Sequence, residues 1–103
     1  MRITCFIVDD SAAGRDRINI VIENFFSDDL EVVGMASSPS VALVQILSQS
    51  PDIVFLDVEM PGITGLDLAQ QLKDKGYKGK IIFVTGHLQY SVKALRVHAF
   101  DYL

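Results

Sequence analysis

The sequence contains no tryptophan, one cysteine and only three prolines in 103 residues. Because Cys5 has no second cysteine to pair with, an internal disulfide is excluded, which suits a reducing cytoplasm. Basic residues are also few: nine Lys and Arg stand against thirteen Asp and Glu, for a formal net charge of −4. A nucleic-acid-binding surface needs clustered basic residues. We therefore expect a cytoplasmic protein that does not contact nucleic acid directly.

Long apolar runs, internal repeats and low-complexity segments are absent as well. The chain begins Met-Arg-Ile-Thr-Cys and reaches two acidic residues at positions 9 and 10, which is not the pattern of a signal peptide. No stretch is long and apolar enough to predict a membrane span. With 50% hydrophobic residues, 103 residues suffice for one core. The sequence thus predicts a single domain over residues 1–103 without membrane association.

One stretch in the middle of the chain combines a strand pattern with chemistry. Residues 53–56 are Ile-Val-Phe-Leu, a run suited to a strand that is covered on both faces. The run ends at Asp57, and Gly62 and Gly65 then turn the chain away. In a parallel α/β sheet, the carboxyl ends of the strands are where ligands bind.

Strand and helix patterns alternate along the rest of the chain. The predicted strands are residues 3–8, 30–36, 53–56, 81–84 and 100–103. Helices are expected after Ser11, after Ser38 or Ser40, over 66–75 and over about 89–97, with Gly76 ending the third. Such alternation predicts βαβ units and a single parallel sheet.

The acidic residues help to choose a strand order. Asp9 and Asp10 follow the first predicted strand and Asp57 ends the third, so a flavodoxin-like order of 2-1-3-4-5 places all three in one crevice. The predicted fold class is therefore α/β, with a doubly wound parallel five-stranded sheet.

Three carboxylates in one crevice point to a cation. Charges ~4 to 6 Å apart in a partly desolvated site repel by a few kcal/mol unless a cation joins them or a pKa rises. Carboxylate oxygens favour Mg²⁺, which retains positions for water and phosphate. Asp9 or Asp10 alone could simply begin a helix. The combination of both with Asp57, and with Thr85 after the fourth strand, favours a functional site.

These motifs resemble a known family. Val8-Asp9-Asp10-Ser11, the run Leu56 to Gly62 followed by Gly65, Val84-Thr85-Gly86, and Phe100-Asp101-Tyr102-Leu103 are similar to the receiver (CheY-like) domain of bacterial two-component response regulators. The resemblance spans the whole chain. The segment from Gln89 to Leu95, running into residues 100–103, is most similar to receivers of LytTR-type regulators.

The resemblance implies a role for each site residue. Asp57 would be the phosphoacceptor, taking a phosphoryl group from a sensor histidine kinase. Asp10 would bind Mg²⁺ directly, Asp9 through water, and Glu59 by its backbone carbonyl, with Asp57 beside them. Thr85 would be the switch hydroxyl and Tyr102 the switch aromatic. The domain would switch an output, such as transcription, rather than act as an enzyme on another substrate.

The chain departs from the family pattern at its end. The family's lysine would fall at position 105, after the last residue, and so would the helix that follows strand five. We therefore expect a C-terminally truncated receiver whose output domain, LytTR or another, lies outside the chain. Loss of the last helix would expose apolar strand residues, which predicts a homodimer or other self-association.

The sequence is also compatible with functions other than phosphorylation. Without the lysine, the chain could be a truncated or degenerate receiver that binds partners independently of phosphorylation. An aspartyl phosphatase usually carries Asp-X-Asp after strand one, whereas this chain has Asp9-Asp10. A flavin-binding protein is disfavoured, because carboxylates after strand one would repel the cofactor phosphate.

Overall fold

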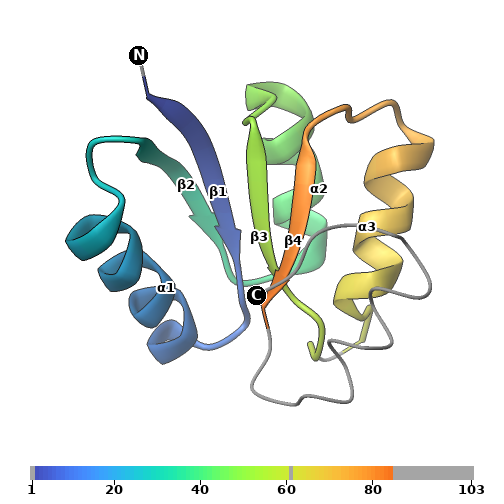
Figure 1. Cartoon of the computed structure of the whole chain (residues 1–103). Coiled ribbons are helices and arrows are strands. Elements are labelled where there is room, and N and C mark those ends of the chain that lie inside the picture. Colours follow the sequence, from blue (N-terminus) through green and yellow to red (C-terminus); the bar gives the residue numbers. More distant parts are fainter. Residues whose placement is uncertain (1, 61, 85–103) are drawn as a thin grey trace.

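Strands and helices alternate through the computed structural model, which describes residues 2–60 and 62–84. These residues form four strands and three helices (Figure 1). In chain order the elements are β1 Ile3–Val8, α1 Ala12–Phe25, β2 Leu30–Ala36, α2 Pro39–Gln49, β3 Ile53–Asp57, α3 Gly65–Asp74 and β4 Lys80–Val84. The predicted strand 100–103 and the helix near 89–97 lie outside the described residues.

The described strands form one parallel sheet with the order β2-β1-β3-β4. This confirms the doubly wound α/β fold and the first four positions of the predicted order. Val8 pairs with Leu56, and Asp57 pairs with Val84. Because all the strands run in one direction, their carboxyl ends lie along one edge of the sheet (Figure 1).

Helices cover both faces of the sheet. The alternation of side chains along β3 shows this division, since Val54 and Leu56 belong to one core cluster and Phe55 to the other. α2 and α3 pack on the first face through Ala42, Ile46, Leu68, Ala69 and Leu72, all fully buried. Among the described elements, α1 alone packs on the second face, through Ile18 and Ile22 (Figure 1).

Hydroxyl side chains begin each described helix. Ser11, Ser38 and Thr64 are the N-caps of α1, α2 and α3, and each accepts a hydrogen bond from a backbone N–H in the first turn. The sequence predicted Ser11 and offered Ser38 as one of two choices. Gly76 follows α3 with φ of 93°, which confirms its predicted role in ending that helix.

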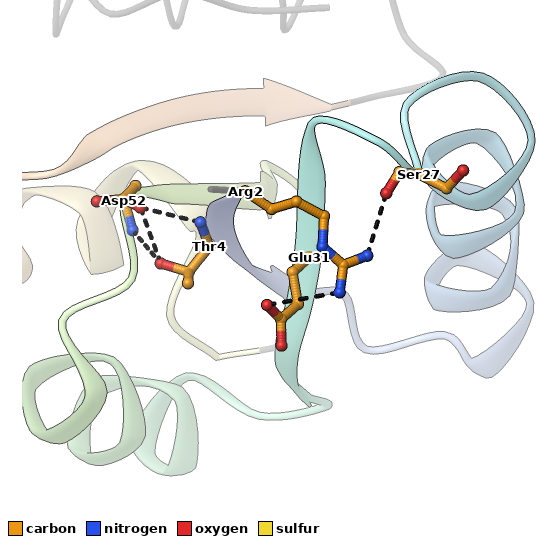
Figure 2. Close-up of polar contacts among 5 residues, drawn as sticks. All are labelled: Arg2, Thr4, Ser27, Glu31 and Asp52. Atoms are coloured by element: carbon orange, nitrogen blue, oxygen red, sulfur yellow. Dashed lines mark hydrogen bonds and ion pairs between the residues drawn. The ribbon is translucent and has the colours of Figure 1, made fainter.

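Side chains at the amino ends of the strands tie distant segments together (Figure 2). The Thr4 backbone N–H and hydroxyl both donate to Asp52 Oδ2, at 2.9 and 3.1 Å, and the Asp52 N–H donates back to the Thr4 hydroxyl at 3.0 Å. Arg2 reaches the Ser27 carbonyl and pairs with Glu31. These contacts stabilise the edge of the sheet where the strands begin. The acidic residues lie at the opposite edge, where the strands end.

Candidate functional site

Three aspartates meet at the carboxyl edge of the sheet. Asp9 and Asp10 follow β1 directly, and Asp57 is the last residue of β3. Since β1 and β3 are paired neighbours ending in register, Val8 opposite Leu56, the residues after them lie side by side. One carboxylate oxygen from each aspartate lies within 4.8 Å of the others. The sequence-based expectation that these three residues share one crevice agrees with this geometry.

The three carboxylates differ in exposure. Asp9 is buried, Asp57 is half-buried and Asp10 is exposed. Asp9 Oδ1 accepts a hydrogen bond from the Ser11 N–H at 2.9 Å, and Asp57 Oδ1 accepts one from the Glu59 N–H at 3.2 Å. The cluster therefore spans a gradient from the protein interior at Asp9 to solvent at Asp10.

The Asp57 carboxyl group has a raised pKa. Burial raises the pKa of Asp57 from 3.8 to about 6, and the negative charge of Asp9 adds to this effect, with smaller contributions from Asp10 and Glu59. The hydrogen bond from the Glu59 N–H acts in the opposite direction. Near neutral pH the carboxylate is thus ionised at a cost that a nearby cation would relieve.

The donor set fits a hard divalent cation. Ligands in reach are carboxylate oxygens, which Mg²⁺ and Ca²⁺ prefer over softer metals. The converging oxygens and the raised pKa of Asp57 are both expected of a site whose positive charge is supplied by a bound ion. Because Asp10 is exposed and Asp57 is only half-buried, water and a second ligand can reach the same point.

A cavity of about 620 Å³ opens from the acidic cluster toward α1. Its acidic end is lined by Asp9, Asp10, Asp57 and Glu59. Apolar side chains from α1, β3 and β4, and the side chain of Phe26 directly after α1, line much of the remainder, including Ile18, Val21, Phe55, Ile82 and Val84. The cavity thus combines an acidic mouth, where a cation could bind, and an apolar wall.

The other predicted site residues divide into two groups. Glu59 lies at the acidic mouth, where its backbone N–H contacts Asp57. Thr85 and Tyr102 lie outside the described residues. Gly14 and Arg15 were not predicted from the sequence, although both contact Asp9 from α1. The one sequence feature that could have indicated Gly14 is the presence of a glycine inside a helical pattern.

Within residues 2–60 and 62–84, no helix has the length and apolar character that crossing a membrane requires.

Comparisons with known proteins agree on one family. A family model described as the response regulator receiver domain matches residues 5–103. The chain is 41% identical to an uncharacterized response regulatory protein of Shewanella oneidensis over 101 residues, which are 98% of this chain and 42% of that protein. It is 37% identical to the transcriptional regulatory protein BtsR of Salmonella typhimurium, again over 98% of this chain and 41% of the relative.

Solved structures are similar in fold as well. The response regulator protein TrrA of Thermotoga maritima, in complex with Mg(2+)-BeF, superposes with a TM-score of 0.77 at 28% identity, covering 100% of this chain and 85% of that one. The chain spans about two fifths of the length of the curated relatives it matches.

Proposed function

Because this chain belongs to the response regulator receiver domain family, we propose that Asp57 is its phosphoacceptor and that Mg²⁺ binds beside it. One observation carries the proposal. Asp57 ends the inner strand β3 with a half-buried carboxylate whose pKa is raised by burial and by Asp9. A carboxylate held in this way, next to two further aspartates, is suited to act as a nucleophile beside a bound cation.

The metal would be held by residues of the carboxyl edge. Asp10, the exposed member, would bind Mg²⁺ directly, Asp9 through a water molecule, and Glu59 through its backbone carbonyl, with an Asp57 oxygen completing the set. The bound ion would supply positive charge that offsets the repulsion between Asp57 and the phosphoryl oxygens. The complex of the similar protein TrrA with Mg(2+)-BeF supports Mg²⁺ as the ion.

Asp57 would do the covalent chemistry. One of its carboxylate oxygens forms a bond to phosphorus while the bond from phosphorus to the donor's histidine nitrogen breaks. The released histidine takes its proton from solvent, and the product is an aspartyl phosphate. The Glu59 N–H, already directed at Asp57 Oδ1, holds the carboxylate during attack. The domain would catalyse only its own modification, as a signalling domain rather than an enzyme with a separate substrate.

Readout of the modification would involve the segment after β4. Thr85, the residue after Val84, would offer its hydroxyl to a phosphoryl oxygen, and Tyr102 would change its exposure as Thr85 moves. Val84, which directly precedes Thr85 in the sequence, pairs with Asp57. This register supports the role given to Thr85.

The partners follow from the same proposal. The phosphodonor would be a sensor histidine kinase, and the receiver, in the cytoplasm, would control an output domain outside residues 1–103. The relative BtsR is a transcriptional regulatory protein, which supports transcription as the output. The similarity of the last residues to LytTR-type receivers favours a DNA-binding output of that type, which would leave the receiver itself without nucleic-acid contacts.

Self-association would use the apolar wall of the cavity. Val21 and Phe26 line this wall and are each 46% exposed. Their burial against a second copy of the chain would remove apolar surface from water. Light scattering over a dilution series should show dimers that dissociate on dilution. A monomer at every concentration would contradict this part of the proposal.

Intact-protein mass spectrometry with acetyl phosphate tests the function. One phosphoryl group should be added when Mg²⁺ is present and none when it is chelated. Asp57→Asn should abolish the addition, whereas Asp74→Asn, an exposed aspartate on α3, should not change it. Modification that persists in Asp57→Asn would remove the nucleophile assignment. No modification of any protein would instead favour a phosphorylation-independent interaction module.

A further inference from the structure

The first turn of α1 holds Asp9 from several directions. Asp9 Oδ1 accepts the Ser11 N–H at 2.9 Å, while the Arg15 guanidinium donates to the Asp9 main-chain carbonyl at 2.9 Å. The Ser11 hydroxyl in turn accepts the Gly14 N–H at 3.2 Å, which caps the helix. Both the carboxylate and the backbone of Asp9 are therefore fixed by α1.

Gly14 makes this arrangement possible because it has no side chain. A Cβ atom built on Gly14 would lie less than 3.0 Å from each of the three carboxyl atoms of Asp9, an approach that real Cβ atoms essentially never make. Gly14 is itself buried within α1. The buried carboxylate of Asp9 thus occupies the space that any other residue at position 14 would fill.

Glycine is needed at position 14 for a different reason than at Gly62 and Gly76. Gly62 and Gly76 have φ of 81° and 93°, and nothing lies within 4 Å of a Cβ added to either, so conformation alone explains them. Gly14 has helical backbone and needs no such freedom. A glycine inside a helix costs about 1 kcal/mol relative to alanine. At Gly14 this loss of helix stability is not offset by a backbone conformation that only glycine adopts. Its only counterpart is the space that Asp9 occupies.

We propose that Gly14 is a positioning residue that sets the Mg²⁺ affinity of the acidic site by letting the Asp9 carboxylate pack directly on the first turn of α1. This inference rests on the proposed function, which takes Mg²⁺ as the ligand. With a methyl group at position 14, the carboxylate must move toward Asp10 and Asp57, where repulsion increases, or outward, where its hydrogen bond from Ser11 is lost. Either displacement weakens a site whose ligands are otherwise already in place.

A double-mutant cycle of Mg²⁺ binding tests the proposal. Titration calorimetry on the whole chain should show Gly14→Ala binding Mg²⁺ about tenfold more weakly than the wild type, the loss typical of residues that orient metal ligands. In the Asp9→Ala background, the same substitution should change the affinity little. Ala13→Gly, an exposed neighbour on the same turn, is the matched control and should bind as the wild type does.

A second readout reports position rather than affinity. In ¹H–¹⁵N NMR spectra without metal, Gly14→Ala should shift the Ser11 amide resonance, because its acceptor on Asp9 has moved. Unchanged Mg²⁺ affinity in Gly14→Ala, or equal losses with and without the Asp9 side chain, would overturn the proposal. So would an unshifted Ser11 amide.

The double-mutant cycle also tests the proposal if Gly14→Ala does not fold. If Gly14→Ala is unfolded because of overlap with Asp9, the double variant Gly14→Ala/Asp9→Ala should fold again, since the overlapping atoms are gone. A double variant that stays unfolded would overturn the proposal. Failure of the proposed function looks different: the wild type itself would bind no Mg²⁺, whereas failure of this inference alone leaves wild-type binding intact and Gly14→Ala unaffected.

Discussion

The Tyr77 hydroxyl donates a hydrogen bond to the Pro51 carbonyl at 2.7 Å, in the buried interior between two loops at the amino edge of the sheet. Tyr77 follows α3 and Pro51 precedes β3, so the bond joins segments 26 residues apart. Burial raises the pKa of Tyr77 to about 12, with the nearby charge of Asp52 adding to it. The hydroxyl therefore stays protonated and remains a donor throughout the neutral range.

Tyr77→Phe should lower the free energy of unfolding by about 1 to 3 kcal/mol, since it leaves the buried Pro51 carbonyl without its partner while keeping the ring. Urea denaturation at pH 7 measures this. The acidic site lies at the opposite edge of the sheet, so Mg²⁺ affinity should be unchanged. A variant as stable as the wild type would mean that water replaces the hydroxyl.

Thr4 and Asp52 provide a second stability test at the same edge (Figure 2). Thr4→Val removes the hydroxyl that both donates to Asp52 Oδ2 and accepts the Asp52 N–H, and should cost about 1 kcal/mol in a largely exposed setting. Thr4→Ser is the matched control, because it keeps the hydroxyl and loses only the methyl group. A Thr4→Val variant no less stable than Thr4→Ser would contradict the contribution assigned to the hydroxyl.

The pH dependence of stability should report on Asp57. Because its pKa rises from 3.8 to about 6 on folding, the native metal-free chain binds a proton more tightly than the unfolded chain. This contribution to stability is full below about pH 4 and is lost as the pH rises through about 6.

Asp57→Asn should remove this dependence and stabilise the metal-free chain at pH 7 by roughly 1 to 2 kcal/mol, after allowance for solvent screening of a half-buried group. Urea denaturation in chelator at pH 4.5 and 7 compares the two proteins. A difference between wild type and variant that is the same at both pH values would contradict the raised pKa.

The two neighbouring aspartates should differ in their effect on Mg²⁺. Asp10→Ala is expected to weaken binding more than Asp9→Ala, because the exposed Asp10 would bind the ion directly and Asp9 through water. Calorimetric titration measures the Mg²⁺ affinity of both variants. Asp74→Asn is the control for the loss of one negative charge. Equal losses in the first two would make their roles interchangeable.

Much of this arrangement could be predicted from the sequence, because parallel strands bring their carboxyl ends to one edge. Apolar runs located β1 and β3, and Asp9, Asp10 and Asp57 follow those runs directly, so strand order sufficed to bring the three together. Ser11 as a cap followed from local chemistry in the same way.

Features that depend on side-chain packing could not be predicted. The register of β1 against β2 shifts between Cys5 and Phe6, so that Phe6 pairs with Gly34, where a Cβ would overlap the Phe6 ring. The contact of Gly14 with Asp9 is of the same kind, since it depends on how closely a helix approaches a strand end. The roles of Thr85 and Tyr102 stay predictions, because both lie outside the described residues.

Chemical trapping of the modified residue tests the central claim most directly. After reaction with acetyl phosphate and Mg²⁺, borohydride reduces an aspartyl phosphate to homoserine, which tandem mass spectrometry locates within the chain. The account predicts homoserine at position 57 and nowhere else, and none when Mg²⁺ is chelated. Homoserine at position 9 or 10, or an unmodified position 57 in a phosphorylated chain, would contradict it.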